Sequence, residues 1–224
     1  MLMAEAEAYR RFRAPQEDGQ TLVDPPRSTL GGVIARNRAH LADLDYDLQG
    51  RSLAELAAAA RRSLVEQALA YTGRYRDVSP RHLEAAQSGG PLVLSGHQPQ
   101  LFHAGVWYKN FVLGDVAAEV GGAAIHLLID SDLCRAASIR VPTGSVAEAR
   151  LETVPFDQPA MDVPYEERSV HDEATFAEFA GRACQLVRPL VASPLLETLW
   201  PLMPAGLVGE RNLGLRMAQG RHRL

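Results

Sequence analysis

Residues 96–109 bring together side chains that can bind and activate an anionic substrate. Two imidazoles can act as acid and base near neutral pH, or donate hydrogen bonds to a charged transition state. A glutamine can recognise a polar substrate group, and a glycine and a lysine near the start of a helix suit a phosphate or carboxylate. The predicted catalytic residues are His97, His103 and Lys109, and the predicted binding residues in this loop are Gly96, Gln98 and Gly105.

A second polar group follows the next apolar stretch, residues 123–129. It contains Asp130 and Asp132, whose carboxylates can hold ribose hydroxyls or a magnesium ion. We predict that both belong to the same binding site as the loop. ATP with Mg²⁺ is one cofactor pair that would suit these groups, and the sequence leaves the identity of the cofactor open.

The elements around these residues predict how the two groups meet. Residues 91–95 read as an apolar strand, residues 105–120 as a helix and residues 123–129 as a second strand. A strand, helix and strand in this order form a parallel βαβ unit, and ligands bind beyond the carboxyl ends of such strands. We therefore expect a Rossmann-like α/β fold in which the loop and the aspartates face one crevice.

Lys109 lies on the apolar stripe of the predicted helix, together with Val106, Leu113 and Val116. A lysine in such a position must extend to solvent, pair with another group, or meet a ligand. Other candidates have plainer interpretations. We expect His126 to be a satisfied core histidine and Cys134 and Cys184 to be packing residues. A zinc site from His97, His103 and Asp130 matches no tight metal pattern, so no metal ligand is predicted.

The remaining chain predicts helices around this core. Ser52 and Glu55 have capping-box spacing, and Ser79 precedes a proline at a first helical position. We predict an N-terminal helical extension over residues 1–90 and an incomplete Rossmann-like core with peripheral helices over 91–224. A third strand is expected at 136–141, and prolines argue against long elements over 151–167. Asp172 is expected to cap a helix, and residues 211–224 read as an element cut off at the C-terminus.

Composition excludes several classes of protein. The 224 residues are 46% hydrophobic and 22% charged, as in ordinary globular proteins, and the net charge of −4 argues against a nucleic-acid or anionic membrane surface. Two distant cysteines do not form a disulfide framework. The sequence shows no secretory signal and no apolar run of about 18 residues. We expect a cytoplasmic protein with a small-molecule substrate and neither a nucleic-acid nor a membrane partner.

The loop also resembles a known family. The run from Ser95 to Lys109, Ser-Gly-His-Gln-Pro-Gln-Leu-Phe-His-Ala-Gly-Val-Trp-Tyr-Lys, followed by a strand ending in Asp130-Ser-Asp132, resembles the core of the bacillithiol-biosynthesis cysteine-adding enzymes, BshC. The residues that match the family's loop are Gly96, Gln98, Leu101, Phe102, Gly105 and Lys109. His97 stands where the family has glutamine, and the acidic segment lacks the family's histidine.

This resemblance implies a core related to nucleotidyltransferases and class I synthetases. It also implies a ligase that joins cysteine to a glucosaminyl malate through a C–N bond, or a related group transferase. Because members are about twice this length, we expect the chain to be truncated at its C-terminus. Two alternatives stay open. The His-Gln-Pro start is also similar to WbqC-like proteins of sugar modification, and an incomplete core could be a binding or assembly module that forms a homo-oligomer or joins a complementing second half.

Overall fold

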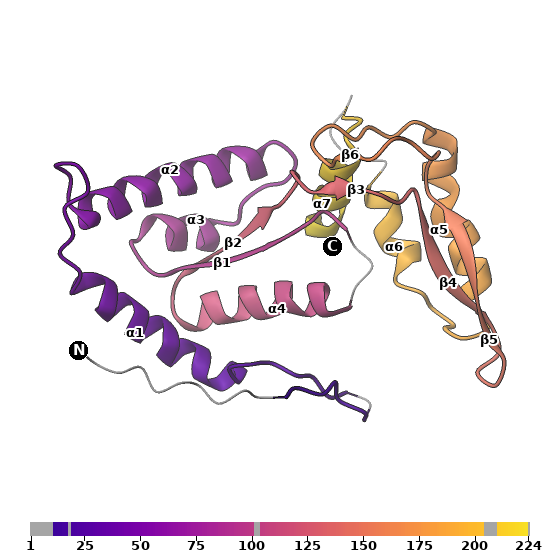
Figure 1. Ribbon diagram of the computed structural model, residues 1–224, viewed down its shortest axis with the longest axis horizontal. Coiled ribbons are helices and arrows are strands. Elements are labelled where there is room, and N and C mark those ends of the chain that lie inside the picture. The colour runs from indigo at the N-terminus through magenta and orange to yellow at the C-terminus, as the bar shows by residue number, and fades with distance from the viewer. Residues whose placement is uncertain (1–10, 18, 101–103, 204–209, 224) are drawn as a thin grey trace. The chain divides into compact units, whose positions relative to one another are not determined.

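The computed structural model describes residues 11–17, 19–100, 104–203 and 210–223. The chain divides into two compact units, residues 1–43 and 44–224. The first unit contains the short 3₁₀ helix η1 (Arg27–Thr29) followed by helix α1 (Leu30–Ala42). All other elements belong to the second unit, so the predicted domain boundary at residue 90 falls inside it. The fold class is mixed α/β, as expected (Figure 1).

The predicted strand–helix–strand segment is confirmed. Strands β1 (Leu92–His97) and β2 (Ala123–Leu128) pair in parallel, and helix α4 (Ala104–Glu119) connects them and packs along both. The helix ends because Gly121 adopts a φ of +62°, which favours glycine, and the backbone N–H of Gly122 donates to the carbonyl of Ala117 at 2.8 Å. The chain then enters β2 directly, which brings the ends of both strands to one edge.

Two helices precede this unit, and both begin where capping residues predicted. Helix α2 (Leu53–Gly73) starts with a complete capping box, in which Ser52 and Glu55 satisfy one another's backbone N–H groups. Helix α3 (Pro80–Gln87) has Pro80 in its first turn and Ser79 as its N-cap. A small apolar cluster of Val65, Ala86 and Ala123 joins both helices to β2.

The expected third strand forms but does not extend the parallel sheet. Strand β4 (Ser138–Gly144) pairs antiparallel with β5 (Ala149–Pro155) through a tight turn, because the intervening chain is too short for a parallel crossover. The prolines limit the elements over 151–167 as expected, because β5 ends at Pro155 and the only strand that follows within this range has two residues. Strands β3 (Leu133–Cys134) and β6 (Val163–Pro164) form a second short antiparallel pair. Among the described residues, parallel pairing occurs only between β1 and β2.

The main hydrophobic core lies among the C-terminal elements. Helix α5 (Glu173–Val187) begins at the Asp172 cap as predicted, and its buried Phe176 and Phe179 contact Trp200, whose ring centroid lies 4.3 Å from that of Phe179. Trp200 belongs to η2 (Trp200–Leu202), which follows α6 (Leu196–Leu199), and its indole N–H donates to the carbonyl of Phe176 at 2.6 Å. Cys134 and Cys184 are buried, as expected for packing residues.

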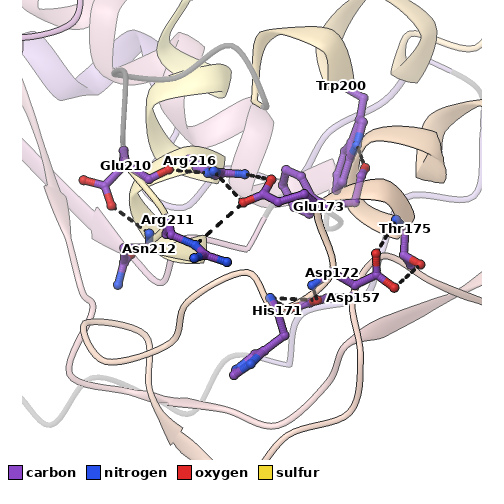
Figure 2. Close-up of polar contacts among 11 residues, drawn as sticks. Asp157, His171, Asp172, Glu173, Thr175, Trp200, Glu210, Arg211, Asn212 and Arg216 are labelled. Carbon is purple, nitrogen blue, oxygen red and sulfur yellow. Dashed lines mark hydrogen bonds and ion pairs between the residues drawn. The ribbon is translucent and has the colours of Figure 1, made fainter.

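The segment read as a truncated element is helix α7 (Leu213–Arg223), which docks on this core. Leu213 and Met217 are fully buried, and the Arg216 guanidinium forms two hydrogen bonds of 2.6 and 2.9 Å to the carboxylate of Glu173 on α5. Figure 2 shows this ion pair beside the Asn212 turn, where the Asn212 side chain caps the first turn of α7 through the backbone N–H of Leu215. These contacts fix both the position and the rotation of α7.

A buried carboxylate holds the start of α5. Asp157 accepts hydrogen bonds from the backbone N–H groups of His171 and Asp172 (Figure 2). It also forms a 2.9 Å ion pair with Arg168. The Asp157 and Arg168 side chains are almost completely inaccessible to solvent. A buried carboxylate remains charged only when donors surround it, so this arrangement is tightly interdependent.

Replacing Asp157 by alanine should therefore destabilise the fold strongly. The change leaves the buried Arg168 charge without its counterion and two backbone donors without an acceptor, which costs about 3–5 kcal/mol. Urea unfolding followed by circular dichroism measures this loss. The exposed Asp162 provides the matched control, because Asp162→Ala should change the unfolding free energy by less than about 0.5 kcal/mol. Equal unfolding midpoints for the two variants would contradict the structural role given to Asp157.

Candidate functional site

The two predicted polar groups meet at one edge of the parallel strands. The side-chain amide of Gln98, just after β1, donates to the Asp132 carboxylate at 2.5 Å. The backbone N–H of Ile129 donates to the carbonyl of His97 at 3.0 Å, which continues the pairing of the strands up to this point. The loop after β1 and the aspartates after β2 are therefore neighbours, as the βαβ interpretation predicted.

Tyr165 and Glu166 also lie at this edge, next to the aspartates, and no sequence pattern predicted them there. The backbone N–H groups of Tyr165 and Glu166 donate to the carbonyls of Asp132 and Asp130, each at 3.0 Å. The Tyr165 hydroxyl accepts a 2.6 Å hydrogen bond from the Gln100 side chain. Burial raises the pKa of Tyr165 to about 12, so its hydroxyl keeps its proton at neutral pH. The loop is thus fastened at Gln98 and at Gln100.

Lys109 points from α4 toward the end of β1. Its ammonium group donates to the carbonyl of Gly96 at 2.7 Å, one of the three hydrogen bonds that a lysine can give. Burial lowers the pKa of Lys109, and the positive charge of Arg221 lowers it further. Of the three outcomes expected for a lysine on an apolar stripe, the structure shows pairing with a backbone carbonyl next to the predicted binding loop.

His97 occupies the last position of β1, and its environment defines which ring nitrogen carries the proton. Nδ1 lies 3.1 Å from the carbonyl of Gln98, which can only accept a hydrogen bond. Nδ1 is therefore the donor, and Nε2 of the neutral ring carries the lone pair. A lone pair on Nε2, next to Gln98, suits a general base or a hydrogen-bond acceptor.

Three other residues of the predicted site are His103, Gly105 and Asp130. His103 lies outside the described residues, as do Leu101 and Phe102, so its predicted role stays a prediction. Gly105 lies in the first turn of α4 and is exposed. Asp130 contributes its backbone carbonyl to the pairing with Glu166.

The structure adds His126 and Arg221 to this region, and neither was predicted to belong to it. His126 lies on β2 and was expected to be a satisfied core histidine. Its Nε2 accepts a 3.1 Å hydrogen bond from the guanidinium of Arg221 on α7, but its buried Nδ1 has no partner among the described residues. Burial and the charges of Arg221 and Lys109 lower the pKa of His126 to about 4. The ring is therefore neutral at pH 7.

Arg221 is not predicted as a site residue because it lies in a tail that carries no recognisable motif. A usable signal was present, however. Leu213, Met217 and Arg221 are spaced four residues apart, so they lie on one face of α7, and the first two are core residues. The rule that drew attention to Lys109 on its apolar stripe applies equally to this arginine.

Metal clusters, membrane-spanning helices and cavities are further features that bear on what a protein can do. Among the described residues, no cluster of three or more histidine, cysteine, aspartate or glutamate side chains is arranged to hold a metal ion. No helix in the described ranges is both long and apolar enough to cross a membrane. A hollow of about 570 Å³ lies at residues 47–56, and none of its lining residues belongs to the predicted site.

Comparison with known proteins finds no matching family model, no matching curated protein and no matching solved structure. The similarities to BshC-like and WbqC-like proteins therefore stay predictions from the loop sequence. The geometry described above has to carry any functional conclusion by itself.

Lys109 offers a direct test of the site's electrostatics, because it is the only lysine in the chain. Reductive methylation with ¹³C-formaldehyde labels Lys109 and the terminal amine alone, and NMR then follows the Lys109 titration. We expect a pKa below that of an exposed lysine, about 10.4. Arg221→Gln should raise the Lys109 pKa, because it removes a neighbouring positive charge.

The exposed Arg140 supplies the control, since Arg140→Gln removes the same charge elsewhere on the second unit and should leave the Lys109 titration unchanged. A Lys109 pKa that equals the ordinary value and does not respond to Arg221→Gln would show that the two cations are not neighbours.

Proposed function

We propose that this protein binds an anionic small molecule, a nucleotide or a sugar acid, at the loop Gly96–Lys109 and the facing segment Asp130–Asp132. The observation that carries this proposal is the contact between Gln98 and Asp132, which makes one site of two polar segments that are separate in sequence. Lys109 supports it by holding a positive charge next to the carbonyl of Gly96, at the edge where ligands of parallel α/β folds bind.

Each residue has a role that its chemistry and position allow. Lys109, with the first turn of α4 around Gly105, holds the phosphate or carboxylate of the ligand. Gln98 and Asp132 recognise polar groups, and Asp130 and Asp132 are the acceptors for ribose hydroxyls or for a magnesium ion bound with ATP. His97 acts as acid, base or hydrogen-bond partner through Nε2, and His103 shares this role.

We also propose a reaction type and a core fold. The motif from Ser95 to Lys109 supports a BshC-like ligase that forms a C–N bond, or a group transferase, built on a Rossmann-like core. A WbqC-like role in sugar modification is the alternative that the His-Gln-Pro start supports. Both use the same anion-binding edge, so the binding experiment below tests what they share.

Isothermal titration calorimetry of the full chain against ATP, cysteine and a glucosaminyl malate tests the proposal. We expect at least one of these ligands to bind, and Lys109→Met to weaken its binding by about 10- to 100-fold, the value of one or two charge-assisted hydrogen bonds. Lys109→Arg should retain part of the affinity, and Arg140→Gln should retain all of it. The absence of heat with every ligand, on protein that circular dichroism shows to be folded, would refute the proposal.

The sheet face of β1 and β2 that α2 and α3 cover at Ala123 remains exposed further along, and this favours a second candidate, an assembly module. Leu94 and Leu127 are 46% and 40% exposed, and the strand register places their side chains on one face. Parallel sheets are normally covered on both faces, so this face is suited to a further strand or helix.

A sizing column with light scattering tests this second candidate. An assembly module should form a concentration-dependent oligomer, and Leu94→Lys combined with Leu127→Lys should shift it toward the monomer. A wild-type chain that stays monomeric at every concentration would argue against the assembly role and would leave the small-molecule proposal unaffected.

A further inference from the structure

Three buried polar atoms close to the proposed site have no hydrogen-bond partner among the described residues. They are Oγ of Ser95, Nδ1 of His126 and one terminal nitrogen of Arg221, Nη1. The strand register pairs Ser95 with His126, so their side chains lie next to each other on one face of the two strands. Arg221 contacts the same histidine through its other terminal nitrogen. Buried polar atoms are nearly always satisfied, so this group calls for an explanation.

The contact between Arg221 and His126 determines the chemistry of the unpartnered atoms. A guanidinium can only donate, so Nε2 of His126 must be the acceptor and its proton must be on Nδ1. Both Nδ1 of His126 and Nη1 of Arg221 are therefore hydrogen-bond donors, and the Ser95 hydroxyl is able to donate as well. A group rich in acceptors can satisfy these three atoms together.

The charge around these atoms is also uncompensated. The charge of Arg221 lowers the pKa of Lys109, and both cations lower the pKa of His126. Apart from burial, the influence on the pKa of Arg221 is the phenol of Tyr75, which is uncharged because burial raises its own pKa. Within the described part of the chain, no carboxylate forms an ion pair with Lys109 or Arg221.

The two buried arginines of the described chain each have a carboxylate partner, whereas the half-buried Arg182, like Arg221, forms no ion pair among the described residues. Arg168 is paired with Asp157, and Arg216 is paired twice with Glu173. Arg168 also has one nitrogen without a partner, but its charge is balanced. The position of Arg221 in the last turn of α7 favours a positive charge through the helix dipole, yet the dipole provides no acceptor for Nη1. Among the described residues, Arg221 therefore has neither a carboxylate partner nor an acceptor for Nη1.

We propose that Arg221, together with His126, Ser95 and Lys109, binds a phosphoryl group of the ligand. This inference rests on the proposed function and adds the substrate class to it: a phosphorylated small molecule instead of a simple carboxylate. Two fixed cations match the charge of a phosphate monoester, which is about −1.5 to −2 at neutral pH, whereas a carboxylate neutralises only one of them. Three phosphate oxygens also provide enough acceptors for the donors that surround them.

The fold explains how residues so distant in sequence reach one position. The hydrogen bond from Lys109 to Gly96 places the lysine one residue beyond Ser95 on β1. The Arg216–Glu173 ion pair fixes the rotation of α7, and the stripe of Leu213, Met217 and Arg221 then faces the interior of the unit. The arginine thus reaches the middle of β2, beside the histidine that pairs with Ser95.

Titration of the full chain with inorganic phosphate tests this inference, with acetate as the comparison ligand. We expect phosphate to bind at least tenfold more tightly than acetate. Arg221→Gln should weaken phosphate binding at least tenfold, Arg221→Lys should weaken it less, and Arg140→Gln should leave it unchanged. Circular dichroism of each variant establishes that it is folded.

A measurement on the unmodified chain keeps the test decisive if the Arg221 variants do not fold. Long-range ¹H–¹⁵N NMR of the histidine rings should show His126 as the Nδ1–H tautomer. Saturation with phosphate should shift both His126 nitrogens and raise the pKa of the histidine, because the bound anion favours the protonated ring.

The possible results separate this inference from the proposed function. Phosphate binding that is equal in wild type and folded Arg221→Gln, or that leaves His126 unshifted, overturns the role of Arg221 and leaves the binding loop in place. Acetate binding as tightly as phosphate overturns the phosphoryl class but supports an anion site at Lys109. If neither anion binds and calorimetry with ATP, cysteine and glucosaminyl malate also shows no heat, both proposals fail.

Discussion

The ion pair between Arg216 and Glu173 is the contact on which the architecture of the candidate site depends. It joins the last helix of the chain to α5 through two parallel hydrogen bonds of 2.6 and 2.9 Å. Bidentate pairing of this kind fixes orientation as well as distance. Leu213 and Met217 occupy the core on the same face of α7 and oppose rotation of the helix. Arg221 on this face is thereby held beside His126. This brings the guanidinium at the end of α7 next to the polar residues of β1 and β2.

Some residues of the site lie close together in the sequence, and others come from distant segments. Gln98 and Asp132 meet because a single βαβ unit brings the ends of its strands together, which is a local consequence of the fold. Tyr165 and Arg221 come from much later segments and add a buried phenol and a guanidinium. Gln98 and Asp132 form a polar edge. Tyr165 adds a hydrogen bond to it, and Arg221 adds a positive charge.

Sequence patterns predicted the local elements well because their causes are local. Capping at Ser52, Ser79 and Asp172, the two apolar strands, and the glycine stop of α4 are all confirmed. Pairing between strands was harder to predict. The strand at 138–144 exists, but only the short turn before β5 determines that it pairs antiparallel, and Pro155 concealed that partner. A Rossmann-like core needs more parallel strands than the one pair, β1 and β2, that the described residues contain.

Prediction of the candidate site had a similar limit. The loop after β1 and the aspartates after β2 were identified from residue types, and the structure places them together. His126 looked like an ordinary core residue because its partner is on α7, and no local pattern connects residues that are so far apart in the chain. The apolar stripe of α7 contains the necessary information, but a tail without a motif indicates only an unfinished element and does not single out its arginine.

The attachment of α7 has a thermodynamic consequence that reaches beyond its own packing. A ligand held jointly by Arg221 and the strand edge would bind only while the helix is docked, so occupancy and docking must stabilise each other by the same free energy. Glu173 touches none of the proposed ligand contacts, yet through Arg216 it would act on affinity from a distance. Ligand affinity would therefore depend on the free energy with which α7 docks on the core.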